Sequence, residues 1–323
     1  MKRVLLAAFL FILAVFPVYA ASSLLFLELQ GVVGYSVTED DFVLHSGHAH
    51  DTMQKNGIGF DFIQKFSGES GDVGMGALQM RLVWDDAEKR IQPQVYNAYL
   101  KFKIGGGDIW AGHNRIAFGA VSYWDTHADL LQPLSMQGFG FDRDWGIGYS
   151  YDFADGDLGI AISTGSGMGL KFRGNWLATS RFSLGILDQD NYTIGFSCMG
   201  GRIPDVMGYV ITGDPVPILI GGLDFAWNHG RFGHKAEFDC GTRADTFALA
   251  ALYRLSYNLL EEDRLKLEVQ GVYASREGME DLFLAGGVTF RITADLAARV
   301  MYQAELIMGD QSLVLQIYWY FGV

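Results

Sequence analysis

Apolar and polar side chains alternate with a period of two along most of this chain. Between residues 244 and 255, for example, Phe247 and Tyr253 belong to one set, and Thr246 and Arg254 belong to the other. Successive side chains of a β-strand point to opposite faces, so this alternation is typical of strands with one apolar and one wet face. No stretch of comparable length keeps the period of a helix. The chain is therefore expected to be all-β.

About sixteen such segments follow one another to the end of the chain, and an even number is typical of single-chain outer-membrane barrels. The predicted strands cover 24–35, 57–66, 73–84, 94–104, 108–118, 143–153, 157–164, 174–187, 191–199, 217–228, 231–241, 244–257, 264–275, 282–292, 295–306 and 312–323. This pattern predicts a transmembrane antiparallel β-barrel that forms one domain over residues 21–323.

The connections between these segments support the same count. In outer-membrane barrels, short turns at one end alternate with longer loops at the other. Every second connection here is short and rich in turn residues, as in Gly105–Gly107 and Asp155–Asp157. The remaining connections include the long ones, at 36–56, 119–142 and 200–216. A missed strand would have broken this alternation.

The alternation also separates two faces, one for lipid and one, rich in Lys, Glu, Gln and Thr, for the interior. The predicted lipid-facing set includes Phe247, Leu249, Tyr253, Leu265, Leu267, Leu284, Val288 and Phe290. Aromatic residues near strand ends would form interfacial girdles; these are Trp84, Tyr96, Trp145, Trp176, Trp227, Tyr257, Tyr273 and Trp319.

A soluble β-sandwich or propeller is the main alternative, because a period of two does not distinguish inside from outside. However, a closed sheet of about sixteen strands encloses a lumen too wide for side chains to fill. A water-filled lumen favours the polar face inward. Although 50% of the residues are hydrophobic, none of them after the N-terminal segment form a run long enough for a membrane helix.

The first twenty residues have the three parts of a secretory signal peptide. Lys2 and Arg3 form a basic region, 4–16 is apolar, and Val18–Ala20 is a small-residue cleavage signal. A membrane anchor is the alternative, but the apolar run is short for one. Removal of residues 1–20 takes away two positive charges and moves the formal charge from -13 to -15. Such an acidic chain is not expected to bind nucleic acid.

Two segments of the chain resemble bacterial porins. Leu313–Val323 alternates like the C-terminal strand of outer-membrane proteins, although it ends in Val323 where the family usually has Phe. Gly112–Gly119 (GHNRIAFG) is similar to the strand before the third extracellular loop of many porins, with Ala117 in place of the usual proline. The architecture as a whole resembles the sixteen-stranded general porins.

This resemblance implies a passive outer-membrane channel of a Gram-negative bacterium, without a cofactor, for small hydrophilic solutes or ions. It implies that the third loop, Ala120–Asp142, folds inward and narrows the channel. It also implies a homotrimer in contact with outer-membrane lipid and lipopolysaccharide. The acidic residues of the long loops favour cations weakly.

Charged residues at a constriction set the selectivity of such a channel. The phase of the strands points Arg81, Lys101 and Lys103 inward, and the third loop supplies acidic residues. A basic wall facing an acidic loop would create a transverse field. The predicted constriction consists of Lys65, Arg81, Lys101, Lys103, Asp125, His127 and Asp129. Alternatively, these are solvated lumen charges that share no constriction.

Other functions have weaker support. The residues His45, His48, His50 and Asp51 form a weak candidate metal site, whose spacing matches no firm zinc pattern. Ser46 near His48, and Gly165–Gly167, are only loose candidates for a hydrolase, and no Gly-x-Ser-x-Gly elbow is present. The chain is therefore not expected to be an enzyme. A barrel that sheathes a partner protein, such as an electron-transfer protein, is the other alternative.

Overall fold

The computed structural model describes residues 19–46, 54–69, 71–86, 88–124 and 129–323. Within these ranges the strands form one antiparallel sheet, in which each long strand pairs with the next along the chain. The last strand, β17 (Gln311–Gly322), pairs with the first, β1 (Tyr19–Ser36), with Phe26 opposite Gly322. Because β1 also pairs with the following long strand, the sheet closes into a barrel.

Sixteen long strands form the wall in the described part of the chain, and one short strand, β2 (Asp41–Val43), pairs with the end of β1. The other strands are β3 (Gly57–Gly68), β4 (Gly71–Asp85), β5 (Arg90–Ile104), β6 (Gly107–Arg115), β7 (Arg143–Phe153), β8 (Gly156–Ser163), β9 (Trp176–Leu184), β10 (Tyr192–Met207), β11 (Val210–His229), β12 (Phe232–Arg243), β13 (Thr246–Leu259), β14 (Leu265–Arg276), β15 (Met279–Arg291) and β16 (Leu296–Glu305).

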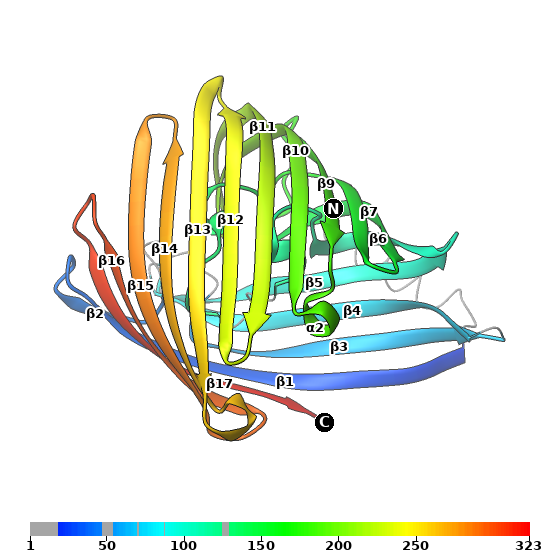
Figure 1. Cartoon of the computed structure of the whole chain (residues 1–323), viewed down its shortest axis with the longest axis horizontal. Helices are drawn as coiled ribbons and strands as arrows, with labels where there is room; N and C mark the ends of the chain where they lie inside the picture. Colours follow the sequence, from blue (N-terminus) through cyan, green and yellow to red (C-terminus); the bar gives the residue numbers. More distant parts are fainter. Residues whose placement is uncertain (1–18, 47–53, 70, 87, 125–128) are drawn as a thin grey trace.

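Helical segments are few and short among the described residues: η1 (Ala120–Ser122), η2 (Leu134–Gln137), α2 (Leu187–Asp190) and η3 (Glu261–Asp263). No helix in that part of the chain is long and apolar enough to cross a membrane. Figure 1 shows the tall strands β10–β14 on one side of the molecule, and β1 and β3–β5 running across below them. Every predicted strand corresponds to one long strand of the barrel, so the predicted fold class and the count of sixteen are confirmed.

One predicted loop is wrong. Residues 200–216 were expected to form a long connection, but they continue β10 and β11 as a paired hairpin that turns at Gly208, whose φ is 59°. The register shifts between Ile203 and Asp205. Pro204 lacks the backbone N–H that a regular ladder needs, so it falls at this irregularity and interrupts the alternating pattern without ending the pairing.

The two ends of the barrel differ. The end at which β3 joins β4, called the turn end here, also carries the C-terminus. Its β5–β6 turn consists of Gly105 and Gly106, whose φ values of 62° and 87° fit a tight hairpin turn that non-glycine residues rarely adopt. The opposite end, called the loop end here, carries the long connections 37–56 and 116–142.

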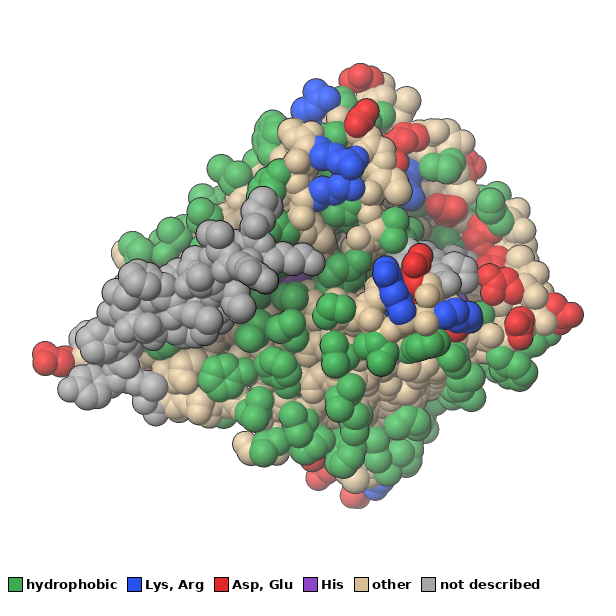
Figure 2. All heavy atoms as spheres, turned by 180° about the vertical axis from the view of Figure 1, so that it is seen from behind, with side chains coloured by type: hydrophobic (Ala, Val, Ile, Leu, Met, Phe, Trp, Pro, Cys, Tyr) green, Lys and Arg blue, Asp and Glu red, His purple; other side chains and the backbone are tan. Residues whose placement is uncertain are grey.

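The faces of the wall follow the predicted phase. Within the predicted lipid-facing set, Phe247, Leu284 and Tyr253 have the largest exposure. Figure 2 shows apolar side chains spread over much of the outer surface. The inner face buries polar and charged side chains such as Gln30 and Gln94. Apolar outside and polar inside is the arrangement of a membrane barrel and the inverse of a soluble one.

Tyr96 does not join an aromatic girdle as expected. A register shift in the β4–β5 pairing, between Gln79 and Met80, places an extra residue in β5 near this position. Tyr96 is consequently buried, and its hydroxyl donates to Asp142 Oδ2 at 3.0 Å. The guanidinium of Arg143 lies 3.7 Å from its ring centroid.

The predicted signal peptide lies outside the described residues, except for Tyr19 and Ala20 at the start of β1. The pairing of β1 with β3 changes register between Ala20 and Ser22, next to the predicted cleavage point. Cleavage after Ala20 therefore stays a prediction, and the pairing from Ser22 onward would be retained after it.

Candidate functional site

The third connection at the loop end, residues 116–142 and called L3 below, folds into the barrel. Its first half enters at Gly119, whose φ is 63°. The amide of Gly119 donates to Ser197 Oγ at 2.9 Å, and that of Ala120 donates to Glu237 Oε1 at 3.1 Å. A Cβ on residue 119 would lie 1.9 Å from Glu237 Oε1, so only glycine allows this approach.

Apolar packing fixes L3 to the inner wall at two places. Near the loop end, Phe118, Leu134 and Phe139 are buried against inward-facing residues of β9–β15, including Ile220 and Leu252. Deeper along the wall, Leu130 and Leu131 pack against Val32, Met301 and Val314. At these two places the inner face is apolar where L3 packs on it. The expected inward course of L3 is confirmed.

Arg254 of β13 holds the middle of L3. Its Nη1 lies 2.6 Å from Asp129 Oδ2, and its Nη2 donates to the carbonyl oxygen of Leu131 at 2.7 Å. Its Nε donates to Gln270 Oε1, and Glu268 lies 3.8 Å from Nη1. The guanidinium is thereby fully engaged and fixes one carboxylate of L3 at a defined place.

Trp124 lies between two cations of the wall. Lys235 Nζ is 3.9 Å and Arg254 Cζ is 4.0 Å from the ring centroid. Cations are attracted to the negative face of an indole ring, most strongly where water is excluded. Trp124 is buried, so these contacts hold L3 against β12 and β13.

The electrostatics of Asp129 follow from these neighbours. Burial by itself would raise the pKa of the Asp129 carboxyl, but the charge and hydrogen bond of Arg254, together with Lys266 and Lys235, hold that pKa below its ordinary value. Asp129 is therefore ionised at neutral pH.

Acid is expected to loosen L3 only at low pH. Because the pKa of Asp129 is lowered on folding, the ion pair with Arg254 stabilises L3 fully above the ordinary aspartate pKa, and this stabilisation is lost as the pH falls through the lowered pKa. Current noise through the reconstituted barrel should be constant down to about pH 4 and should rise below it. In the Asp129→Asn variant, the current should already be noisy at neutral pH. An equal rise of current noise below about pH 4 in the wild type and in this variant would show that Asp129 is not the group responsible.

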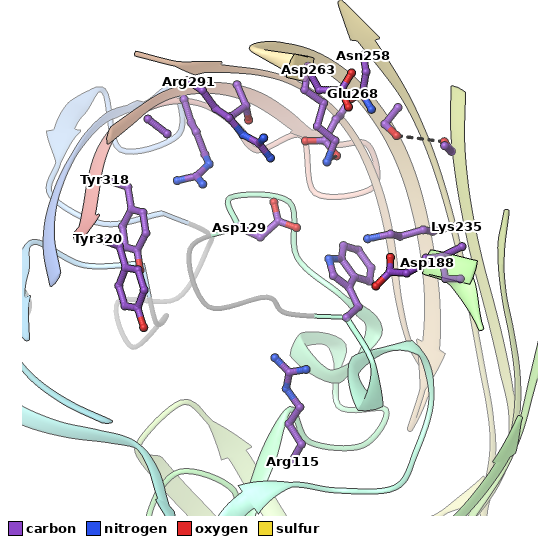
Figure 3. A pocket seen from close by; sticks show the side chains of 18 of the residues that line it. Arg115, Asp129, Asp188, Lys235, Asn258, Asp263, Glu268, Arg291, Tyr318 and Tyr320 are labelled. Atoms are coloured by element: carbon purple, nitrogen blue, oxygen red, sulfur yellow. Dashed lines mark hydrogen bonds and ion pairs between the residues drawn. The ribbon is translucent and has the colours of Figure 1, made fainter. Parts of the chain in front are cut away.

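A cavity of about 950 Å³ occupies the lumen between L3 and the turn end. Figure 3 shows Arg115, Lys235 and Arg291 directed into it from different sides, with Asp129 on the loop between them. Its charged lining residues are Asp61, Arg115, Asp129, Arg143, Asp188, Lys235, Asp263, Lys266, Glu268, Arg291 and Arg299. The lining of this cavity is therefore mostly polar and charged.

A smaller cavity of about 70 Å³ lies among L3, Gln54 and the tip of the β10–β11 hairpin at Met207. Asp129 and Arg143 line both this cavity and the large one. The place where these two residues adjoin both cavities is called the passage below. Arg143 is fixed there by Asp142 and by Asn97 Oδ1, to which its Nε donates at 2.8 Å.

The predicted constriction residues do not all gather at this passage. Lys65, Lys101 and Lys103 lie near the turn end of β3 and β5, and Lys101 forms an ion pair with Asp108 at 2.8 Å. Lys65 and Lys101 share one row, on either side of Met75. The structure therefore separates these lysines along their strands from the loop-end passage.

Two further predicted residues face the lumen in different surroundings. Arg81 is buried in the wall, where its Nε donates to Gln94 and its Nη1 lies 3.6 Å from Glu28. Asp129 lies at the passage with Arg254. Asp125 and His127 lie outside the described residues.

Sequence reasoning placed Arg254 in the lumen but assigned no role to it, and it missed Arg143 and Trp124 as parts of the site. The phase of β13 shows only that Arg254 points inward. Its partnership with Asp129 spans 125 residues, and no local pattern reports such a contact.

The other candidates gain no support. Among the described residues, no group of three or more His, Cys, Asp or Glu has the arrangement of a metal site. His48, His50 and Asp51 lie outside those residues, and His45 is buried. Ser166 is also buried, with its hydroxyl 2.7 Å from Thr164 Oγ1.

A closed sixteen-stranded barrel with an apolar outer face and an inward third loop defines the general-porin type of outer-membrane fold. This is the fold of the chain, and the predicted resemblance is confirmed at that level. No protein-family model matches the sequence. No curated protein matches it either.

Solved structures share this fold at low sequence identity. OmpF of Salmonella typhi, in complex with daunomycin, has a TM-score of 0.69 and 13% identity over 93% of this chain and 97% of that one. An anion-selective porin from Comamonas acidovorans has a TM-score of 0.65 and 10% identity over 93% and 99%. The trimer form of OmpT, an outer membrane protein of Vibrio cholerae, has a TM-score of 0.65 and 11% identity over 93% and 99%.

Proposed function

We propose that this protein is a passive outer-membrane channel of a Gram-negative bacterium for small hydrophilic solutes or ions. The observation that carries the proposal is the inward course of L3 in a polar lumen, where Asp129 of L3 and Arg143 of β7 line both cavities. A solute crossing the barrel would pass these two charges. L3 would therefore set the size limit, and the charges would orient polar solutes.

The channel is favoured over a sheath for a partner protein. A sheath needs a lumen free of its own chain, whereas L3 is fixed inside this barrel by Phe118, Leu131 and Arg254. The proposal carries with it a homotrimer in outer-membrane lipid and lipopolysaccharide, as well as a non-enzymatic role. The trimeric form of OmpT supports the oligomeric state, and the apolar outer face supports the contact with lipid.

Planar-bilayer recording of the refolded protein tests the proposal. Discrete conductance steps are expected, and Arg143→Ala should increase their size because it removes the guanidinium from the passage between the two cavities. Lys101→Ala with Lys103→Ala serves as the comparison, since it removes two charges near the turn end. Its effect on conductance should be smaller than that of Arg143→Ala.

The absence of conductance steps from a correctly folded protein would refute the channel. If Lys101→Ala with Lys103→Ala changes the conductance more than Arg143→Ala does, the constriction lies near the turn end, beside the lysines that the sequence predicted for it.

A further inference from the structure

Two arginines share the inner face of neighbouring strands on the side of the lumen away from L3's entry. Arg291 of β15 pairs with Ala297 of β16, and Arg299 lies two residues further along β16, opposite Thr289. Diagonal neighbours of this kind have backbone positions roughly 7–8 Å apart, so two long side chains reach a common point. All four residues line the large cavity.

Among the described residues, no carboxylate lies within ion-pair distance of either guanidinium. Arg299 Nη1 donates instead to the neutral side chain of Gln316 at 2.8 Å. Four other inward arginines of the described chain differ in this respect. Arg81, Arg143, Arg181 and Arg254 each have an acidic partner.

The acidic residues that line the same cavity form no ion pair with either arginine in the described part of the chain. Asp129 pairs with Arg254, and Glu268 lies 2.7 Å from Lys266 Nζ. Asp263 directly precedes Arg264, whose carbonyl accepts from the amide of Arg291, but it forms no ion pair with Arg291. The two guanidinium groups of β15 and β16 therefore lack a direct carboxylate partner among the described residues, while Asp129 and Glu268 act on Arg299 at longer range.

The register also leaves room beside these charges. Ala297 lies in one row between Arg291 and Tyr318 of β17, so the smallest side chain of that row is the central one. Arg299 Cζ lies 5.4 Å from the Tyr318 ring centroid, which fixes one edge of the space. A short side chain between two long ones leaves a recess that opens into the cavity.

We propose that Arg291 and Arg299, over the recess at Ala297, form a binding subsite for small oxyanions, either carboxylates or phosphates. Two guanidinium groups from neighbouring strands that line one cavity match the charge and the paired oxygens of these anions. The subsite rests on the proposed channel function, and it gives the channel a preference for anionic solutes. This differs from the weak preference for cations that the acidic loops suggested.

The decisive comparison uses the refolded barrel and the double variant Arg291→Gln with Arg299→Gln. In the wild type, inorganic phosphate or succinate added to potassium chloride should reduce the chloride current, and the reversal potential in a salt gradient should show anion preference. In the double variant, about tenfold more of the oxyanion should be needed, and the reversal potential should shift towards cations.

Arg264→Gln is the matched control. Arg264 lies at the same level of the wall, where its carbonyl accepts from the amide of Arg291, but its guanidinium is 5.6 Å from the lipid-facing Phe290 ring. This variant removes one positive charge outside the lumen, compared with two in the double variant, and it should behave like the wild type. Testing phosphate and succinate separately shows which oxyanion the subsite takes, and binding of either one supports it.

Conductance steps with no difference between the double variant and the wild type would overturn the subsite and leave the channel intact. If the barrel does not conduct, the channel proposal fails, and titration calorimetry of the refolded protein with phosphate and succinate still decides the subsite. Binding that is lost in the double variant would support it, and the absence of binding to the wild type would refute it.

Discussion

Replacing Arg254 by methionine is expected to release the middle of L3 and to lower the free energy of unfolding by about 3–5 kcal/mol. Arg254 is 2% exposed and is bound to Asp129, Leu131 and Gln270. Methionine keeps much of the length of the side chain but removes every donor. The carboxylates of Asp129 and Glu268 would then be left without this guanidinium in a largely buried place.

The measurements are urea unfolding of the barrel in lipid vesicles and the noise of single-channel current. We expect Asp129→Asn to cost less, about 1–3 kcal/mol, because Glu268 still neutralises Arg254 in that variant. The double variant should be more stable than the sum of the two single changes predicts, because each change removes the same ion pair. If the two losses of unfolding free energy simply add in the double variant and the current noise stays at the wild-type level, Arg254 does not hold L3.

Shortening Phe118 to alanine is expected to have the second large effect, a loss of about 3–5 kcal/mol in the free energy of unfolding. Phe118 is 1% exposed and lies in the apolar cluster between L3 and the inner wall. It directly precedes Gly119 and Ala120, whose amides bind Ser197 and Glu237. The resulting cavity should therefore loosen the entry of L3 into the barrel and increase both conductance and flicker.

Phe238→Ala is the control for this variant. Phe238 lies on β12 next to Glu237, but it is 45% exposed and faces outward. The Phe238→Ala variant should lose less free energy of unfolding than Phe118→Ala and should keep the wild-type conductance, since lipid can fill the space of the missing ring. Equal effects of the two substitutions would mean that the barrel wall, and not the seat of L3, determines the current.

Local pattern was enough to predict the barrel wall. In a strand, the side-chain period is two whatever the strand packs against, so the phases of Phe247 and Arg254 could be read without the fold. The same pattern failed where the backbone departed from a regular ladder. The extra residue of β5 turned Tyr96 inward, and Pro204 hid the extension of β10.

The site was predicted only in part. The resemblance of Gly112–Gly119 to porins correctly predicted that the following loop folds inward, and Asp129 lies on that loop. The phase of the strands also indicated that Lys101 points inward. It gave no information about the height of this residue along the barrel axis, because that height depends on strand tilt and on the stagger between strands.

By itself, then, the sequence determined the number of strands and the face that each side chain takes, because the strand period of two is a relation between near neighbours in the chain. The entry of L3 into the lumen was predicted only through the resemblance of Gly112–Gly119 to porins. Only the tertiary structure decided which charges meet. Arg254 reaches Asp129, Lys235 lies over the ring of Trp124, and Arg291 and Arg299 have no ion-pair partner in the described part of the chain. These relations join residues that are far apart in the chain, and they exist only once the barrel has closed and L3 has packed against its inner wall.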